Sequence, residues 1–380
     1  MRDGVSDLLV VLTYYSPYVS GLTNVAREVA EGLAARGYRI TVVTSQHDRG
    51  LPAEEIINGV RVLRAPVWTR VGKGTISPQL ARLALREARH ARVVNLHLPM
   101  LDAGLIARAS DAPVVVTYHC DVSLPPARVT SRWQQFVIDR SSRTAMHNSS
   151  AVVVSSEDYA RHSRLWASIR PSMVAIPPPC RPCPGGTPHY RDGDGFHVGF
   201  LGRIVAEKGL EYLVRGFQTL EDPRARLLIG GDYTNVAGGS TIHRLRHLIR
   251  GDSRIRLLGF VPDERLPDLY ASMDVLALPS VNAFEAFGIV QVVAMLRGVP
   301  VLVSNLPGVR VPVRETGFGE IVAPRDAGSI GRALGRMKAA DPMPRDGIAR
   351  AADRFDLGGV IDAYETLFEK AASDLQERGR

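Results

Sequence analysis

Cysteine is scarce in this chain, which has only Cys120, Cys180 and Cys183 among its 380 residues. A small secreted fold held by disulfide bonds is therefore excluded, and a reducing compartment, the cytoplasm, is the simpler expectation. No apolar run approaches the ~18 residues that a membrane span needs. The first 12 residues hold one short apolar run and no small-residue cleavage site, so we expect no signal peptide.

Charge of one sign is not concentrated in any block either. The 47 basic residues outnumber the 39 acidic ones, and the excess, mostly arginine, is scattered along the chain to give a net charge of +8. This excess weakly indicates an anionic ligand or surface. The hydrophobic fraction of 45% is that of a globular protein, and the length favours two domains.

Apolar runs of strand length alternate with helical patterns in the first half. Residues 8–13 form one such run, a helical pattern follows at 23–36, and residues 39–44 form the next run. Strands that are continuously apolar predict a parallel sheet covered on both faces. Further strands are expected at 60–65, 92–97, 113–118 and 151–155, and a long helix at 128–147.

Residues 176–195 are so rich in proline and glycine that neither a sheet nor a helix can continue there. The alternation then restarts, which predicts an α/β fold of two doubly wound domains with ligands in the cleft between them. The second half is expected to hold strands at 196–201, 226–229, 255–258, 275–278 and 300–303, with helices at 209–220 and 240–250. The predicted division is a first domain at 1–177, a linker at 178–194, a second domain at 195–359, and a terminal helix at 360–380 that could pack back on the first domain.

Three residues of the first half lie where strands end, and parallel sheets bind ligands at those ends. Gly21 precedes the first helix, where a missing Cβ lets backbone amides approach a phosphate; a simple turn is the alternative. His119 could hydrogen-bond a ligand or merely its own loop. His97 could meet an acceptor, although a structural role explains it at least as well.

The second half has two further candidates at equivalent positions. Arg203 and Lys208, within the stretch 202–209, match a diphosphate whose negative charge grows as a bond to it breaks. Solvated side chains flanking a turn are the alternative. Glu285 stands before a Phe-Gly-Ile-Val run that begins a helix, so a carboxylate lies beside several amide donors. Stabilisation of the helix dipole is the alternative role.

These segments occur in an order that resembles the GT-B glycosyltransferases, in particular the retaining family 4, over nearly the whole chain. The motifs that carry the resemblance are the Gly21 loop, Thr117-Tyr118-His119, G-R-x-x-x-x-K-G at 202–209, Gly259-Phe260-Val261-Pro262, Glu285-Ala-Phe-Gly-Ile-Val, and the stretches 298–303 and 316–324. The resemblance implies two Rossmann-like domains facing across a cleft. It also implies retaining transfer of a sugar from a nucleotide-diphosphate sugar, a UDP- or GDP-sugar, to an unidentified acceptor, without a metal or other cofactor.

The resemblance also assigns roles to individual residues. Arg203 and Lys208 would hold the donor diphosphate as the leaving group. Glu285 would bind hydroxyls of the donor sugar, and His119 would touch that sugar from the other domain. The assisting backbone groups would be those of Gly21, Ala286, Phe287, Gly288, Ile289 and Val290.

The chain departs from the family pattern at Val293, where the family has a second glutamate that binds the ribose hydroxyls of the nucleotide. Valine cannot accept those hydrogen bonds, each worth about 1.5–3 kcal/mol, and Gln291 points elsewhere on the helix. Donor binding could be weaker, or donor choice altered. The chain could also be a non-catalytic nucleotide-sugar-binding partner of another transferase. A nucleotide-sugar epimerase of the same architecture is a further alternative.

The segment 128–143 mixes arginines with Trp133 and Phe136 on the long helix of the first half. This composition suits peripheral contact with an anionic membrane. We favour the more ordinary interpretation, an amphipathic helix with its apolar side on the sheet and its arginines in water. No nucleic-acid-binding module is present in the sequence.

Overall fold

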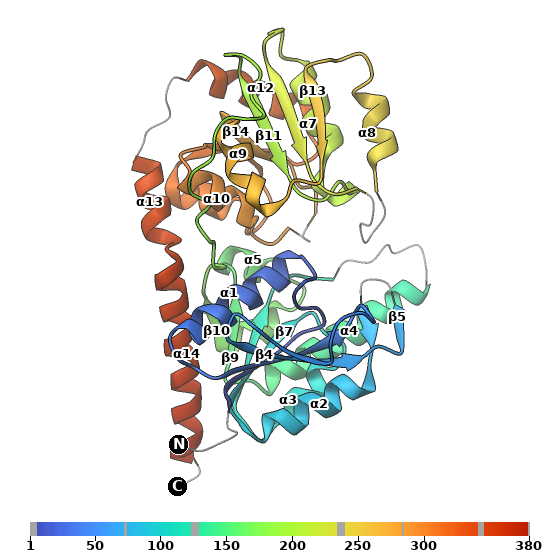
Figure 1. Cartoon of the computed structure of the whole chain (residues 1–380), viewed down its shortest axis with the longest axis vertical. Coiled ribbons are helices and arrows are strands. Elements are labelled where there is room, and N and C mark those ends of the chain that lie inside the picture. Colours follow the sequence, from blue (N-terminus) through green and yellow to red (C-terminus); the bar gives the residue numbers. More distant parts are fainter. Residues whose placement is uncertain are drawn as a thin grey trace. The chain divides into compact units, whose positions relative to one another are not determined.

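The computed structural model describes residues 6–71, 74–122, 129–233, 240–282, 285–340 and 346–378. The chain forms two compact units, one made of Met1–Pro179 with Leu357–Arg380 and the other of Cys180–Asp356 (Figure 1). Each unit is a doubly wound α/β fold, so the predicted fold class is confirmed.

The first unit is built on an eight-stranded sheet in the order β10-β9-β8-β7-β1-β2-β4-β3. All neighbouring strands are parallel except the edge strand β3, which pairs antiparallel with β4 in a hairpin that the sequence pattern did not reveal. The strands are β1 (Ser6–Val11), β2 (Ile40–Gln46), β3 (Glu54–Ile57), β4 (Val60–Pro66), β7 (Ala91–Leu98), β8 (Val114–Tyr118), β9 (Ala151–Val154) and β10 (Met173–Ala175), with a separate small hairpin of β5 (Thr69–Val71) and β6 (Gly74–Ile76).

Helices cover both faces of this sheet, which explains its continuously apolar strands: Leu8, Leu9, Val10 and Val11 of β1 are all buried. Ser20 begins the first helix, because its hydroxyl accepts a hydrogen bond from the Thr23 amide at 3.1 Å. The helices of the unit are α1 (Gly21–Ala35), α2 (Pro78–Ala88), α3 (Ala103–Ala109), α4 (Val129–His147), α5 (Glu157–Arg161), α6 (Trp166–Ile169), the 3-10 helix η1 (Arg170–Ser172) and α14 (Leu357–Arg378).

The last helix, α14, belongs to the first unit although the whole second unit separates it from the rest in sequence (Figure 1). Its Ile361 and Tyr364 are buried in the same core as Val29 of α1. A Cβ on Gly32 of α1 would lie 3.0 Å from the Ile361 side chain, so this glycine permits the close approach of the two helices. The terminal helix is therefore part of the first unit's core.

The second unit has a six-stranded, all-parallel sheet in the order β13-β12-β11-β14-β15-β16. Its strands are β11 (His197–Leu201), β12 (Arg226–Gly230), β13 (Ile255–Gly259), β14 (Val275–Leu278), β15 (Val301–Ser304) and β16 (Gly319–Val322). Its helices are η2 (Ala206–Lys208), α7 (Leu210–Gln218), α8 (Ile242–Leu248), η3 (Asp263–Arg265), α9 (Leu266–Ala271), α10 (Ile289–Leu296), α11 (Val311–Thr316), α12 (Ala327–Ala339) and α13 (Asp346–Arg354).

The proline-rich segment after residue 176 contains no helix or strand as far as β11, but it is not a free tether. Cys180 is fully buried in the core of the second unit. The Tyr190 amide donates to Ser272 Oγ at 3.0 Å, and Arg191 pairs with Asp274 at 2.9 Å. The expectation of a separate linker at 178–194 therefore needs correction, because most of this segment packs on the second unit.

The preferred interpretation of the long basic helix is wrong for its two large aromatic residues. Trp133 and Phe136 of α4 are 68% and 61% exposed, although we expected them on the sheet. The helix instead packs through smaller side chains such as Ser142 and Ala145 together with Met146. None of the helices in the described part of the chain is both long and apolar enough to cross a membrane.

Candidate functional site

The site in the second unit lies where the sheet reverses its order of strands. β11 and β14 are neighbours in the middle of the sheet, but the chain continues from β11 towards β12 and from β14 towards β15, on opposite sides. The loops that follow these two strands therefore diverge and leave an opening at their carboxyl ends, the usual ligand position in such sheets. Arg203 and Lys208 follow β11, and Glu285 follows β14.

The loop after β11 presents two cations. Arg203 is largely exposed and its Nη2 lies 3.3 Å from Glu207 Oε1. Lys208 ends the short helix η2, and Gly209 then takes a left-handed conformation with φ of +65°. A Cβ on Gly209 would lie 2.2 Å from the Pro279 carbonyl oxygen, so only glycine lets this loop press against the loop after β14.

Lys208 and Glu285 form an ion pair across the two loops, although 77 residues separate them in sequence. Their side chains are only 17% and 16% exposed. Glu285 Oε2 also accepts a hydrogen bond from Ser280 Oγ at 3.2 Å, and the Val281 amide donates to the Glu207 carbonyl at 2.9 Å. The structure thus brings together one of the predicted cations and the predicted carboxylate, and it adds Ser280, which the sequence reasoning missed.

The segment after Glu285 offers its backbone and not its side chains. Phe287 is buried against Phe355, with ring centroids 5.8 Å apart. Gly288 has φ of +80° immediately before α10, and a Cβ there would lie 2.3 Å from the Leu278 side chain. The first amides of α10, including those of Ile289 and Val290, have no acceptor within their own helix. They are suited to an anionic ligand.

Val293 lies one helical turn into α10 and packs partly against the apolar core of the unit. Gln291 is fully buried, and its amide nitrogen donates to the carbonyls of Phe287 and Val309, the latter at 2.9 Å. Its Oε1 has no hydrogen-bond partner among the described residues, but because it is buried it cannot reach a ligand and so does not supply the acceptor that Val293 lacks. The interior of this helix presents no carboxylate where the family pattern has one.

In the first unit the corresponding switch point is between β1 and β7. The loop after β1 leads to Ser20 and Gly21 at the start of α1, and nothing lies within 4 Å of the place where a Gly21 side chain would begin. The space over the first turn of α1 is therefore open on the glycine side.

His119 follows β8, and its Nε2 lies 2.8 Å from Nδ1 of His97, the penultimate residue of the adjacent strand β7. His97 is 1% exposed, so it lies beneath His119 and the suggestion that it meets an acceptor directly is wrong. Burial lowers the pKa of His119 to about 3, and burial next to His119 lowers the pKa of His97 well below its ordinary value. Both rings are therefore neutral near pH 7, and one of them donates its N–H to the other in the hydrogen bond between them.

The contact between these two rings uses one nitrogen of each. In either tautomer, Nε2 of His97 is buried without a hydrogen-bond partner among the described residues, and Nδ1 of His119 stays available to a ligand. Sequence reasoning identified His97 only as a residue at a strand end. Aligning the two strands as a parallel pair, with His97 opposite Thr117, could have shown that His97 lies close to His119, two residues further along.

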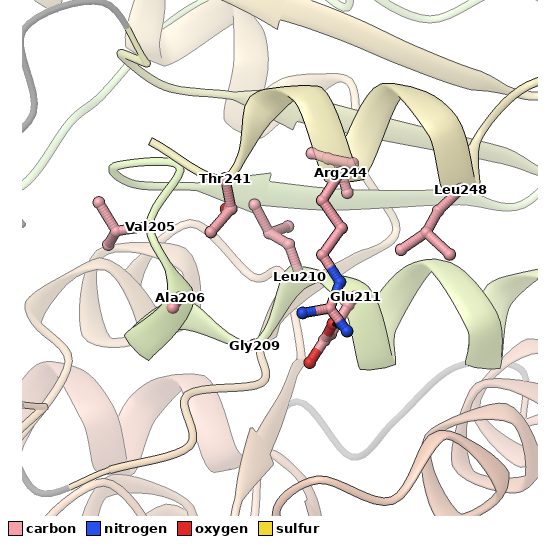
Figure 2. A pocket seen from close by; sticks show the side chains of 9 residues that line it. Val205, Ala206, Gly209, Leu210, Glu211, Thr241, Arg244 and Leu248 are labelled. Carbon is pink, nitrogen blue, oxygen red and sulfur yellow. Dashed lines mark ion pairs between the residues drawn. The ribbon is translucent and has the colours of Figure 1, made fainter. Parts of the chain in front are cut away.

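A small surface pocket of the second unit lies beside this site, between η2, α7 and α8. Figure 2 shows Arg244 of α8 reaching across to Glu211 of α7, and their charged atoms are 2.8 Å apart. Its lining is mostly apolar, from Val205, Leu210, Leu245 and Leu248, and includes neither Lys208 nor Glu285 among the described residues. We therefore place the candidate anion site at the Lys208–Glu285 pair and not in this pocket.

Family models match both units of the chain. Residues 20–179 match the glycosyl transferase 4-like domain, and residues 188–354 match glycosyl transferases group 1. The D-inositol 3-phosphate glycosyltransferase of Mycolicibacterium smegmatis is 26% identical, over 94% of this chain and 88% of its own length.

Solved structures share the fold. The sucrose-phosphate synthase of Thermosynechococcus elongatus superimposes with a TM-score of 0.79 at 19% identity, over 97% of this chain and 99% of its own. The Anabaena protein HepE in complex with UDP-glucose gives a TM-score of 0.68 at 18% identity, over 97% of this chain and 99% of its own. The predicted GT-B fold is confirmed.

Proposed function

Because the two units of the chain match glycosyl transferase families, the 4-like domain at 20–179 and group 1 at 188–354, we propose that it moves a sugar from a nucleoside-diphosphate sugar to an acceptor with retention of the anomeric configuration. The observation that carries the proposal is the Lys208–Glu285 ion pair at the switch point of the second sheet, with Arg203 on the same loop as Lys208. A cation and a sugar-binding carboxylate in contact suit a ligand that has a diphosphate next to a sugar.

In this proposal Lys208 and Arg203 hold the diphosphate, whose negative charge grows as the glycosidic bond to the sugar breaks. Fixed cations of this kind take the place that a divalent metal ion has in other transferases, so we propose a metal-independent reaction. Glu285 accepts hydrogen bonds from sugar hydroxyls. The backbone amides of residues 286–290 assist, as do those at the start of α1 near Gly21.

His119 completes the proposed donor contacts, and the partners of Glu285 bear on the mechanism. His119 contacts the donor sugar with a neutral ring, which can donate or accept a hydrogen bond through Nδ1. Glu285 is already engaged with Lys208 and Ser280, which supports front-face attack, with a donor phosphate oxygen taking the proton of the acceptor. A covalent intermediate on Glu285 is not needed in this route.

The donor is proposed to be a UDP- or GDP-sugar, which is supported by HepE, a protein of the same fold solved with UDP-glucose. The acceptor is a glycolipid, a polysaccharide or a small-molecule glycoside. Val293 favours one competing function, a non-catalytic partner that binds nucleotide sugars for another transferase, because α10 lacks the ribose-binding carboxylate. No feature of the described residues favours an epimerase.

Calorimetric titration of the natural chain and of Val293→Glu with UDP, GDP and their sugars, in the presence of EDTA, tests the proposal. Each binder is then tested for slow hydrolysis of the donor, and the anomer of the released sugar is read by NMR before it equilibrates. Binding and hydrolysis by the natural chain, with release of the retained anomer, support the transferase. Binding without hydrolysis, or binding by the Val293→Glu variant alone, would support the partner function instead.

A further inference from the structure

One face of α4 in the first unit is exposed and carries large aromatic and basic side chains. Trp133 and Phe136 are 68% and 61% exposed, where such large apolar side chains are ordinarily buried. They lie on one helical stripe: Arg132 and Trp133 are four and three residues before Phe136, and from Phe136 onward successive members are three or four residues apart. The stripe consists of Arg132, Trp133, Phe136, Arg140, Arg143 and His147, all exposed.

The packing of α4 in the first unit does not depend on these exposed side chains. The opposite side of α4 holds the helix in place, since Ala145 and Met146 are buried and Ser141 Oγ accepts a hydrogen bond from the Gly104 amide of α3 at 3.0 Å. The helix has one acidic residue, Asp139, which is mostly buried and pairs with Arg164 at 3.2 Å. The exposed stripe therefore contains no carboxylate.

The neighbouring helix α3 and the turn before it also expose apolar side chains. Leu101 and Leu105 are exposed, and the Leu101 carbonyl accepts a hydrogen bond from Ser141 Oγ of α4 at 2.7 Å. Arg108 of α3 is exposed as well. We name the exposed stripe of α4 together with Leu101 and Leu105 the α3–α4 face.

We propose that the α3–α4 face docks on an anionic lipid bilayer. Trp133, Phe136 and the leucines would enter the interfacial layer, while the arginines would bind phosphate groups of the lipids. Charge complementarity favours lipid over an acidic protein. Basic groups flank the aromatic pair, and the stripe contains no carboxylate. Protein interfaces usually combine charges of both signs to specify a partner.

The position of the stripe suggests what docking achieves. A crossover helix of a parallel sheet starts at the carboxyl end of one strand and returns to the amino end of the next. α4 has 19 residues and is about 28 Å long, whereas the five residues of β8 span about 16 Å, so the helix is long enough to run the full length of the strand. Trp133 and Phe136 lie in its first turns. These residues therefore lie towards the sheet edge that carries His119. Resting on the proposed function, docking would bring that edge to an acceptor held in the bilayer.

Flotation of the full-length protein with vesicles tests the docking without any substrate. We expect binding to vesicles of phosphatidylcholine with 30% phosphatidylglycerol, and weak or absent binding to phosphatidylcholine alone. Each Arg→Gln substitution at positions 132, 140 and 143 should weaken binding about fivefold. Trp133→Ser with Phe136→Ser should weaken it at least tenfold, and because both side chains are exposed the fold should persist, as UDP binding and circular dichroism can check.

Trp68 provides a matched control, since it is also 68% exposed but lies outside α3 and α4. Trp68→Ser should leave vesicle binding unchanged. In a Trp68→Phe, Trp166→Phe variant Trp133 is the only tryptophan, and its fluorescence should shift to the blue and be quenched by brominated lipids.

Three outcomes would overturn the docking: no binding to anionic vesicles, binding that is equally sensitive to Trp68 and Trp133, and bound protein in which Trp133 is not quenched. The last two would show a general attraction of the basic chain to anionic surfaces. None of them affects UDP binding at the second unit, so failure of this proposal and failure of the proposed function are distinguishable.

Discussion

The Lys208–Glu285 pair gives the sharpest prediction, because neutralising its two members should change nucleotide affinity in opposite directions. Lys208→Gln removes a charged donor to the diphosphate. Hydrogen bonds to charged groups are worth about 1.5–3 kcal/mol, so UDP affinity should fall roughly 10- to 150-fold. Glu285→Gln instead frees Lys208, whose ammonium is held by the carboxylate in the absence of ligand.

The magnitude of the second effect follows from the contact between the two side chains. A phosphate oxygen that reaches the same ammonium comes within about 6 Å of the Glu285 carboxylate, where the repulsion between unit charges is about 3 kcal/mol at an effective dielectric constant near 20. Even a third of this energy makes UDP bind Glu285→Gln at least about fivefold more tightly. The gain should be smaller for UDP-sugars, since the variant also loses a contact to the sugar.

Isothermal titration with UDP, on the natural chain and both variants, measures these affinities. Lys338→Gln is the matched control, because Lys338 pairs with Asp222 at 2.6 Å on the same unit but outside the proposed site. Its UDP affinity should equal that of the natural chain. Weaker UDP binding by Glu285→Gln, similar to that of Lys208→Gln, would refute the reasoning and assign the pair a purely structural role.

Three more perturbations follow from the geometry. Gly209→Ala should lower the free energy of unfolding in urea by more than about 2 kcal/mol and weaken UDP binding, because the residue has a positive φ and its new Cβ would clash with a carbonyl oxygen. Gly251→Ala is the control: Gly251 has a φ of +86° but open space around it, so the cost should be only about 1–2 kcal/mol. Equal costs at the two positions would contradict the role of the loop contact. Because the folded-state pKa of His119 is lowered to about 3, the unfolded chain binds its proton first as the pH falls below about 6.5, and stability is lost in that direction. Urea unfolding at pH 7 and pH 5 should show His119 contributing up to about 2 kcal/mol of this loss, and His119→Asn should reduce the difference; an unchanged difference would argue against a neutral, partly buried ring. Tyr364→Ala in α14 should destabilise the first unit by about 3–5 kcal/mol, read by its urea midpoint, and a change near zero would mean that α14 is not part of that core.

Local patterns were sufficient for most of the strands and helices and for the class of fold. The apolar runs that became β1 and β14 are unbroken because both faces of their sheets are covered, so side chains pointing to either face are buried and apolar. The hairpin of β3 and β4 escaped prediction because β3 is a partly exposed edge strand with a weak apolar signal. Trp133 and Phe136 were misjudged for a related reason: an apolar side chain signals burial only when another surface of the chain is there to cover it.

The sequence by itself determined which residues carry charge or lack a Cβ at strand ends, and thus that Arg203, Lys208 and Glu285 are candidates for an anionic ligand. Only the tertiary structure decided that Lys208 meets Glu285, and that His97 supports His119 from below. The physical reason is the range of the interactions. Helix and strand patterns depend on neighbours a few residues away, whereas these contacts join residues 22 to 77 positions apart, which become neighbours only when parallel strands align.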